Sequence, residues 1–339
     1  MADSPTIQHE SAPQRQSLRT KETAQVAILL CILNGEAFLA EQLDSIERQS
    51  HSAWKLWVSD NGSTDKTLDI LNRYARKWRA DKLSVVAGPA AHPGAVARSG
   101  SAGATDNFLS IACNSKISAD FYAFCDCDDI WEPDKIARAL AWLSGIPPEI
   151  PALYCSRTRL IDRQGCPIGL SPLFTRKPGF ANAVVQTMGG GNTMVFNESA
   201  RVLLRKAGAD VGVPYHDWWL YQIVSGCGGN VFYDSAPSLD YRQHGNNLLG
   251  SNREFSARLR RLKLLLGGRF QEWVGENLRG LEKIESNLTP ENKFIFKQFK
   301  DARKASLIPR LVGVWQSGLY RQTVFGSFIF YLAAILGKI

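Results

Sequence analysis

The stretch VAILLCILNGEAFLAEQLDSIERQ, from Val26 to Gln49, decides the fold of this chain. It begins with a continuous apolar run, which is typical of a strand buried on both faces of a sheet. The run ends at Asn34-Gly35, after which apolar residues recur at the spacing of a helix. The same order of strand, polar turn and helix returns in KLWVS, DNGSTD and KTLDILNRYARKW. Strands that alternate with helices predict an α/β fold with a mainly parallel sheet flanked by helices.

Two further strand and helix units extend this pattern. LSVVA is followed by a loop rich in Gly, Ala and Pro and by the short helix DNFLSIACNS, and FYAFCD is followed by the helix PDKIARALAWL. Three of the strands run into polar loops, which read LNGE, SDNGSTD and DCDD. Because ligands of parallel sheets bind at the carboxyl ends of the strands, we expect these three loops to meet at one ligand-binding edge.

The chain has 339 residues, of which 45% are hydrophobic, and a formal charge of +8. From Arg253 onward there are sixteen Lys or Arg and seven Asp or Glu, a balance of +9, so the preceding part is nearly neutral. Residues 1–24 are polar and lack the apolar segment of a secretory signal, which predicts a flexible start and a cytoplasmic protein. Seven cysteines without a CxxC pair predict reduced thiols rather than a disulfide framework or a zinc site.

The second half of the chain is less regular. ALYCSRTRLI, NTMVFN and NVFYD have the composition of strands, and ESARVLLRKAG and HDWWLYQIVSG that of helices. Beyond Asn252 the chain becomes basic and helical in pattern. We therefore expect an α/β domain over residues 25–252 and a basic helical region over residues 253–339.

The loop after FYAFC carries three carboxylates, Asp126, Asp128 and Asp129. A strand that runs into Asp-x-Asp places two carboxylates within reach of one centre, and Mg²⁺ and Mn²⁺ prefer such oxygen ligands. Since Mg²⁺ usually completes its shell with substrate phosphates, the cluster predicts a divalent metal shared with a diphosphate. The alternative is an acidic loop that is favoured by the positive end of the following helix.

Taken together, these motifs resemble the family 2 glycosyltransferases, which are inverting enzymes with the GT-A fold. The resemblance is carried by VAILLCILNGEAFLAEQLDSI, WVSDNGSTDKTLDIL, FYAFCDCDDIW and HDWW, and it covers roughly Val26 to Ser251. YHDWW and DYRQHGNNLLGS are most similar to the rhamnosyltransferase-like branch, and SGLYRQTVFG near the end is similar as well. The resemblance implies transfer of a sugar, with rhamnose as a candidate, from a UDP- or dTDP-sugar. The implied acceptor is a glycan or a lipid-linked glycan in surface polysaccharide synthesis.

The resemblance also implies a nucleotide-sugar site at the strand ends. The residues assigned to it are Cys31, Leu33, Asn34, Asp60, Asn107 and Asp126. Asp60 would accept a hydrogen bond from the ring N3–H of uracil or thymine. Asp126-Cys127-Asp128 matches the DxD motif of the family, with Asp126 directed towards ribose or metal and Asp128 as the principal metal ligand.

Some positions depart from the family pattern. Leu33 stands where relatives often carry an aromatic residue, and Asn61 where they often carry a second acid. In the long loop from Gly88 to Ala104, Arg98 is a candidate for the basic residue near the diphosphate. Arg242 and His244 in YRQHGNN are further candidates for this role, and His244 is a candidate third metal ligand, although a lone histidine is more often structural.

Inversion at an anomeric carbon requires one base for the acceptor hydroxyl, and Asp217 in PYHDWW is the candidate. The alternative is that Asp217 is only the N-cap of the following helix. Trp218 and Trp219 favour a site, because exposed aromatic rings stack on sugars. We expect both tryptophans to bind the acceptor, together with His216 and with Asn192 of the glycine-rich stretch MGGGNTMVF.

The final apolar run, from Val324 to Leu336, has thirteen residues, fewer than the roughly 20 needed to span a bilayer. With cations upstream, it predicts peripheral attachment to the inner face of the cell membrane, and the alternative is packing on the catalytic domain or on a second subunit. Two other functions stay open, namely an inactive GT-A-like carbohydrate-binding protein and an aspartate-nucleophile phosphatase. We expect no nucleic-acid partner.

Overall fold

The computed structural model describes residues 23–79, 81–89, 100–244 and 268–339. Nearly all of the predicted flexible start at residues 1–24 lies outside these ranges, as do Arg98 and the predicted boundary near Asn252. The division into residues 1–24, 25–252 and 253–339 therefore stays a prediction.

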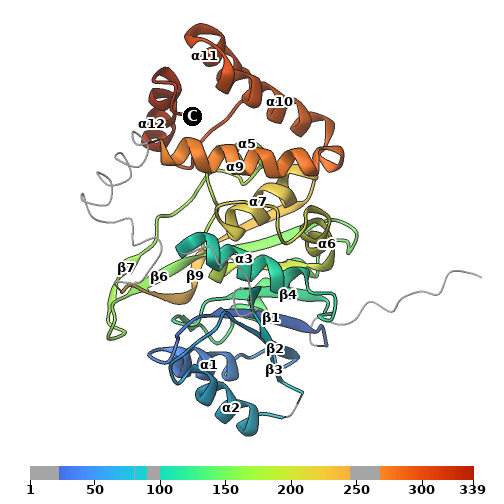
Figure 1. The fold of residues 1–339 in the computed structure, drawn as a ribbon, viewed down its shortest axis with the longest axis vertical. Helices are drawn as coiled ribbons and strands as arrows, with labels where there is room; N and C mark the ends of the chain where they lie inside the picture. The colour runs from blue at the N-terminus through green and yellow to red at the C-terminus, as the bar shows by residue number, and fades with distance from the viewer. Residues whose placement is uncertain (1–22, 80, 90–99, 245–267) are drawn as a thin grey trace, which may run out of the picture.

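Four parallel strands form the first half of the central sheet. They are β1 (Val26–Ile32), β2 (Trp54–Asp60), β3 (Leu83–Ala87) and β4 (Phe121–Cys125), in the spatial order β3-β2-β1-β4 (Figure 1). The register pairs Ile32 with Asp60 and Leu30 with Cys125, so β1, β2 and β4 end at nearly the same level. The three polar loops therefore leave the sheet at one edge, as the sequence predicted.

The other half of the sheet is mixed. Its strands are β5 (Ile130–Trp131), β6 (Ala152–Ile161), β7 (Pro167–Leu170), β8 (Val195–Asn197) and β9 (Asn230–Arg242). β8 runs antiparallel to β4 and β6, whereas β6 and β9 are parallel to each other. Two strand predictions need correction. NTMVFN is a strand only over its last three residues, because Gly191–Thr193 form a 3-10 turn, and NVFYD continues to Arg242 because it pairs along the whole of β6.

Helices cover both faces of the sheet (Figure 1). On one face lie α1 (Leu39–Glu47), α2 (Thr67–Lys77) and α4 (Lys135–Leu143); on the other lie α3 (Gly100–Cys113), α6 (Glu198–Ala207) and α7 (His216–Gly226), with α5 (Phe180–Ala183) packed against α7. Val26, Ile28 and Leu30 of β1 enter one core, and Ala27 and Leu29 enter the other. A strand that is apolar at every position is thereby buried on both sides.

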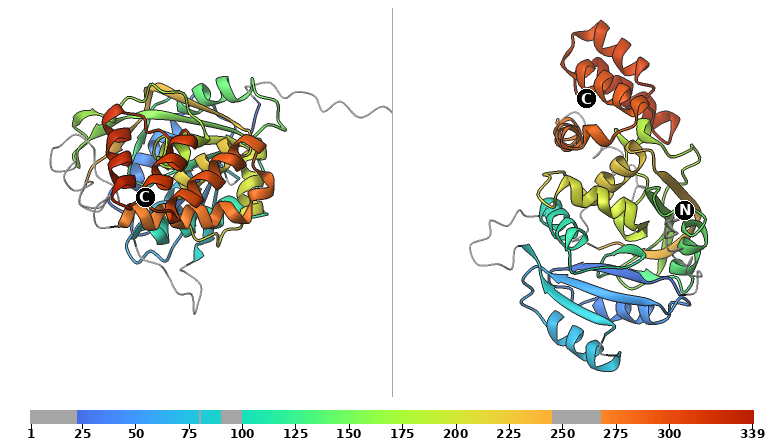
Figure 2. Two further views of the ribbon diagram at one scale, coloured as in Figure 1. Left: turned by 90° about the horizontal axis from the view of Figure 1, so that it is seen from above. Right: turned by 90° about the vertical axis from the view of Figure 1, so that its right-hand side faces the viewer.

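Four C-terminal helices extend the core around α7. They are α9 (Arg269–Lys283), α10 (Pro290–Lys304), α11 (Leu307–Gln316) and α12 (Val324–Ile335), and they form the end of the molecule opposite β1–β3 (Figures 1 and 2). Trp218 of α7 stacks on Phe270 of α9, which in turn contacts Phe330 of α12. In the described ranges, no helix is both long and apolar enough to cross a membrane.

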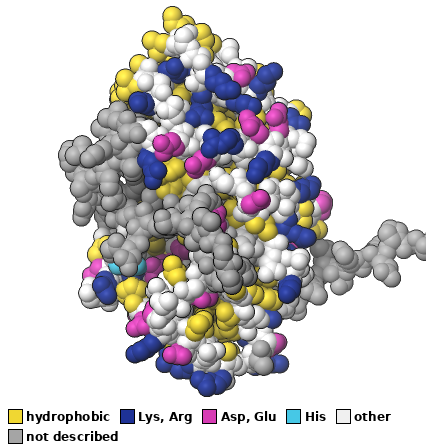
Figure 3. Space-filling model, viewed as in Figure 1, with side chains coloured by type: hydrophobic (Ala, Val, Ile, Leu, Met, Phe, Trp, Pro, Cys, Tyr) yellow, Lys and Arg dark blue, Asp and Glu magenta, His cyan; other side chains and the backbone are white. Residues whose placement is uncertain are grey.

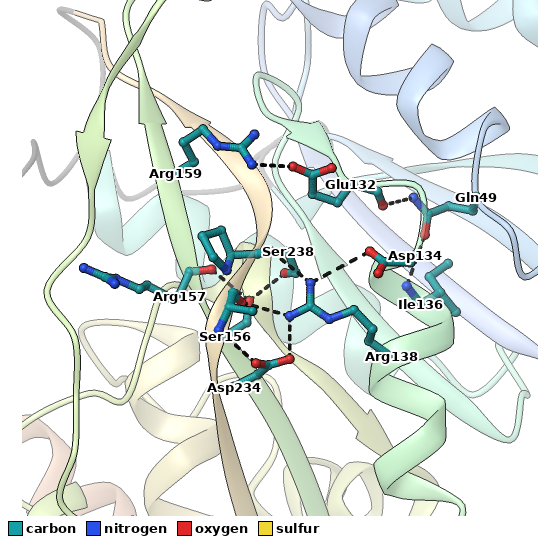
Figure 4. Close-up of polar contacts among 12 residues, drawn as sticks. Gln49, Glu132, Asp134, Ile136, Arg138, Ser156, Arg157, Arg159, Asp234 and Ser238 are labelled. Atoms are coloured by element: carbon teal, nitrogen blue, oxygen red, sulfur yellow. Dashed lines mark hydrogen bonds and ion pairs between the residues drawn. The ribbon is translucent and has the colours of Figure 1, made fainter.

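A polar network holds the chain just beyond the acidic cluster against the mixed half of the sheet (Figure 4). Arg138 of α4 donates to the carboxylate of Asp234 in β9 at 2.5 Å. Arg159 of β6 forms an ion pair with Glu132 at 2.8 Å, and Gln49 donates to the carbonyl of Glu132 at 2.7 Å. Because Glu132 directly follows β5, these contacts fix the far end of the acidic loop.

Candidate active site

The loops after β1 and β2 are joined to each other. Asn34 adopts a φ of 54°, in the left-handed region that Asn tolerates better than most residues. Its amide oxygen accepts from the backbone N–H of Thr64 at 2.8 Å, and its own N–H donates to Ser63 Oγ at 2.9 Å. Leu33, just before this turn, is 55% exposed. The two loops thus form one platform with an exposed apolar residue.

Asp60 and Asn107 fix the end of β2. The carboxylate of Asp60 accepts from the N–H groups of Gly62 at 3.2 Å and Ser63 at 3.1 Å. The amide oxygen of Asn107, in α3, accepts from Ser59 Oγ at 2.5 Å, and its amide nitrogen donates to the Ser59 carbonyl at 3.1 Å. Both predicted nucleotide residues are therefore buried supports of the turn at this strand end.

Three carboxylates, Asp126, Asp128 and Asp217, gather at the end of β4. Burial and the neighbouring charges of Asp128 and Asp217 raise the pKa of Asp126 to about 8. Burial, with the charges of Asp126 and Cys127 as smaller causes, raises the pKa of the Cys31 thiol well above its usual range. The site therefore combines a cluster of like charges with a neutral thiol at the end of β1.

Asp128 is paired with His244, which follows β9. His244 Nε2 lies 2.7 Å from Asp128 Oδ2. Within the described ranges, no group of three or more His, Cys, Asp and Glu side chains is arranged to hold a metal alone. Mg²⁺, however, usually takes one or two protein carboxylates and completes its shell with water and substrate phosphate. The carboxylates of Asp126 and Asp128 fit a partial site of that kind, with His244 beside Asp128.

Asp217 lies in the first turn of α7. The N-cap position belongs to Tyr215, so the alternative that Asp217 is only the N-cap is wrong. The carboxylate accepts from the backbone N–H of Trp218 at 2.6 Å and from that of Gly191. Burial raises the pKa of Asp217 to about 6, against the opposing effect of these backbone donors. Such a carboxylate is mostly ionised at neutral pH and still accepts a proton readily, which suits a general base.

The profile of Glycosyl transferase family 2 matches residues 27–157, which run from β1 into β6 and include all three polar loops. This region is a family 2 glycosyltransferase domain. The chain is also 29% identical over 239 residues to the dTDP-rhamnosyl transferase RfbG of Shigella flexneri. That similarity covers 68% of this chain and 77% of the relative.

The chain has the GT-A fold. TarS 1–349 of S. aureus, solved in complex with UDP-GlcNAc, superimposes with a TM-score of 0.51 over 87% of this chain and 93% of that chain, at 13% identity. GalNAc-T7, solved with UDP, GalNAc and Mn²⁺, superimposes with a TM-score of 0.51 over 91% of this chain and 57% of that chain, also at 13% identity. At these identities the likeness shows the fold alone.

The two tryptophans beside Asp217 are core residues. Trp218 and Trp219 are both buried. The indole N–H of Trp218 donates to the Ala183 carbonyl at 2.6 Å, and Trp219 packs against Gly280 of α9. Successive residues of a helix point about 100° apart, so Asp217 faces the site while its two neighbours face the core. The prediction that Trp218 and Trp219 are exposed and stack on the acceptor is wrong.

His216 lies beside the carboxylates as a neutral ring. It stacks on Phe108 at 4.0 Å between ring centroids and meets Phe124 edge-on at 4.8 Å. Burial lowers its pKa to about 3. Its buried Nε2 has no hydrogen-bond partner in the part of the chain that the structure describes, and a Cβ at Gly191 would collide with this ring. The role of His216 towards the acceptor stays a prediction.

Asn192 and Arg242 hold the acidic loop from inside the protein, and both are buried. Asn192 Nδ2 donates to Asp129 at 2.5 Å. Arg242 Nε donates to the Asp128 carbonyl at 3.0 Å, and its Nη2 donates to the carboxylate of Glu41 at 2.6 Å. The predictions that Asn192 lines the acceptor cleft and that Arg242 meets the nucleotide sugar therefore need correction, because both side chains are used in positioning the loop.

Two buried charges in this support were missed in the sequence. Asp129 is fully buried, and burial together with Asp128 and Asp126 raises its pKa well above the usual range. Lys135 is also fully buried and donates to the Asn192 carbonyl at 2.9 Å, and burial lowers its pKa to about 7. A signal was present, since Lys135 precedes the buried Ala139 by one helical turn and so lies on the inward face of α4.

Proposed function

We propose that this family 2 glycosyltransferase moves a sugar from a UDP- or dTDP-sugar to a hydroxyl of a glycan or lipid-linked acceptor, with inversion at the anomeric carbon. The observation that carries the proposal is the convergence of Asp126, Asp128 and Asp217 at the carboxyl edge of the parallel strands. The first two belong to the loop on the donor side, and Asp217 approaches them from α7. This separation supports distinct roles for the two groups of carboxylates.

In the proposed reaction, Asp217 takes the proton of the acceptor hydroxyl while the hydroxyl oxygen attacks the anomeric carbon. The bond from that carbon to the diphosphate breaks, and its electron pair leaves with the nucleoside diphosphate. The pKa of about 6 and the position in the first turn of α7 support this role. The helix N-terminus favours the ionised form, whereas burial keeps the carboxylate basic enough to bind a proton.

We also propose that the enzyme uses Mg²⁺ or Mn²⁺, held by Asp126 and Asp128 with His244 beside them. When bound, the cation would neutralise charge on the departing diphosphate. Support comes from the burial of Asp126 beside the carboxylates of Asp128 and Asp217, which together raise its pKa to about 8 and whose charge a cation would offset. The GT-A neighbour GalNAc-T7 was solved with UDP and Mn²⁺.

The first donor to test is dTDP-rhamnose. Its choice rests on the similarity to a dTDP-rhamnosyl transferase over 68% of this chain. In the proposed complex the base lies on the platform of the β1 and β2 loops, with its N3–H directed to Asp60 and one face on Leu33. Asn34 and Asn107 would act by holding these loops in place.

We place the acceptor in surface polysaccharide synthesis and the enzyme at the cytoplasmic face of the cell membrane as a peripheral protein. The similarity to a rhamnosyl transferase and the basic C-terminal helices support this assignment. A carbohydrate acceptor fits better than a phosphatase substrate, because the acidic motif follows β4 in a family 2 glycosyltransferase domain.

A nucleotide-release assay tests the proposal. The purified protein is incubated with dTDP-rhamnose, other dTDP-sugars and UDP-sugars, each with Mn²⁺ or with EDTA, and free dTDP or UDP is measured. We expect metal-dependent release from at least one donor and its loss in Asp128→Ala. Asp69→Ala, which removes an exposed acid on α2, is the matched control and should retain release. A folded wild-type protein that neither binds nor cleaves any of these donors would contradict the proposal.

A further inference from the structure

The helices α11 and α12 pack against each other, and both carry exposed apolar side chains. The main ones are Ile308, Val312 and Trp315 of α11 and Val324, Phe325 and Phe328 of α12, which we call the α11–α12 surface. Val324 is 89% exposed, Ile308 74% and Trp315 72%. Ile308, Val312 and Trp315 are spaced by four and three residues and so lie on one face of α11. Figure 3 shows hydrophobic side chains gathered at this end of the molecule.

The exposed residues belong to helices that are otherwise well packed. Phe330, Ala333 and Ala334 of α12 are buried in the core, where Phe330 contacts Phe299 of α10. In α11, Val314 is buried as well. Both helices are therefore apolar on a face that the protein covers and also on a face that it leaves open. Exposed apolar patches of this extent mark interaction surfaces in soluble domains.

The segment that carries the α11–α12 surface has basic side chains and no acidic ones. From Ala302 to the end, the chain carries five cations, Arg303, Lys304, Arg310, Arg321 and Lys338, and its side chains include no carboxylate. Two more cations lie against the start of α12. Arg176 Nη1 donates to the Arg321 carbonyl at 3.1 Å, and the Lys177 carbonyl accepts from the hydroxyl of Tyr320 at 2.5 Å. The surface thus combines apolar rings with positive charge.

The start of α12 is tied to the acceptor side of the site. The backbone N–H of Gln322 donates to Gln186 Oε1 at 2.9 Å, and Asn182 Nδ2 donates to the Tyr320 carbonyl at 3.0 Å. The segment that holds Asn182 and Gln186 continues into the turn at Gly191, whose N–H reaches Asp217. The segment from Asn182 to Gly191 therefore connects the start of α12 with the proposed base, Asp217.

We propose that the α11–α12 surface binds a bilayer rich in anionic lipid, with the apolar rings inserted between headgroups and the cations at the phosphate level. At 12 residues α12 is too short to span a bilayer, which fits a helix lying in the interface. This inference rests on the proposed function in one respect: a lipid-linked acceptor would be presented at this surface. The charge complementarity favours a lipid surface over a second copy of the chain, because two such basic surfaces repel each other.

Vesicle flotation with the full chain tests the inference without any donor or acceptor. We expect the wild type to float with vesicles of phosphatidylcholine and phosphatidylglycerol, and binding to phosphatidylcholine alone to be at least tenfold weaker. The double variant Phe325→Glu, Phe328→Glu should lose at least tenfold in partitioning. Lys177→Gln and Lys304→Gln should each lower partitioning onto these vesicles by about fivefold. The matched controls Val85→Glu on β3 and Arg76→Gln on α2 lie at the opposite end of the molecule and should bind as the wild type does (Figure 1).

The outcomes separate this inference from the proposed function. Failure of the wild type to bind anionic vesicles, or wild-type binding by the Phe325 and Phe328 variant, would overturn the inference. A dimer that the same variant disrupts, without vesicle binding, would show that a second copy covers the surface and would also overturn it. Metal-dependent nucleotide release by this variant in solution should equal that of the wild type, so a failed vesicle experiment leaves the release assay intact.

Discussion

The proposed donor side of the site is made from strand ends, whereas the proposed acceptor side is made from the first turn of one helix. On the donor side, β1, β2 and β4 end at one level, so whole loops face the ligand edge. On the acceptor side, α7 turns Asp217 towards the site and the next two residues into the core. The difference teaches that the end of a strand fixes where a whole loop lies, whereas on a helix the direction of the side chain changes from one residue to the next.

The largest effect is expected on the acceptor side. Asp217→Asn should lower kcat by about 10³-fold, because an amide does not take up the proton of the acceptor hydroxyl. Donor affinity should be retained, since the donor loops are intact. Single-turnover transfer and calorimetric titration with dTDP or UDP measure the two quantities. Loss of donor binding in this variant would contradict the assignment of Asp217 to the acceptor side alone.

The support of the acidic loop comes next. Asn192→Ala should lower the free energy of unfolding by about 2–4 kcal/mol, because it leaves the buried carboxylate of Asp129 without its amide donor. Denaturant unfolding measures this loss, and Asn72→Ala on the exposed side of α2 is the control. A variant of unchanged stability with a raised acceptor KM would show instead that Asn192 lines the acceptor cleft.

The donor carboxylates should make the metal-free protein sensitive to pH. Asp126 has a pKa of about 8 in the folded protein and an ordinary value of 3.8. Between these values the folded state binds the extra proton, so stability falls as pH rises from about 4 to 8. Asp126→Asn should therefore raise the free energy of unfolding by about 1–3 kcal/mol at pH 8 and change it little at pH 4.

Denaturant unfolding in EDTA at the two pH values measures this effect, with Asp69→Asn as the control. The variant should also lose metal-dependent nucleotide release, as expected when a residue is retained for function at a cost in stability. A variant that is less stable than the wild type at pH 8 would show that Asp126 is not crowded by like charge.

The smallest effect concerns the platform. Leu33→Tyr should tighten dTDP or UDP binding by about fivefold, because a base stacks better on an aromatic ring than on an aliphatic side chain. Its stability should stay within about 0.5 kcal/mol of the wild type, since the side chain is exposed. Leu68→Tyr, at an exposed position of α2, is the control for calorimetric titration. Equal affinities in both variants would place the base away from Leu33.

The strands and polar loops of the donor side could be predicted from the sequence. LSVVA has the bounds of β3, and the three polar loops lie at one edge as expected. These predictions succeed because a continuous apolar run is stable in such a fold only as a strand in the middle of a covered sheet. The loop that follows the strand then lies at the carboxyl edge of the sheet. The position of Asp126 and Asp128 is thus set locally.

The acceptor side could not be predicted in the same way. HDWWLYQIVSG has the bounds of α7, but nearly every residue from Trp218 onward is buried, so the pattern shows no polar face from which to orient Asp217. The pairing of Asn192 with Asp129 and of Arg242 with the Asp128 carbonyl depends on contacts far apart in the sequence. The sequence does not reveal these contacts, so a buried polar residue near a motif cannot be told from a ligand-binding residue.

The most direct test of Asp217 as a base for single displacement is the anomeric configuration of the product. Once nucleotide release has identified the donor, the purified product is examined by NMR, and the one-bond coupling at its anomeric carbon is compared with that of the donor. Direct attack by the acceptor hydroxyl predicts a configuration opposite to the donor's. A product that retains the donor's configuration would contradict the proposed role of Asp217 as the base of a single displacement.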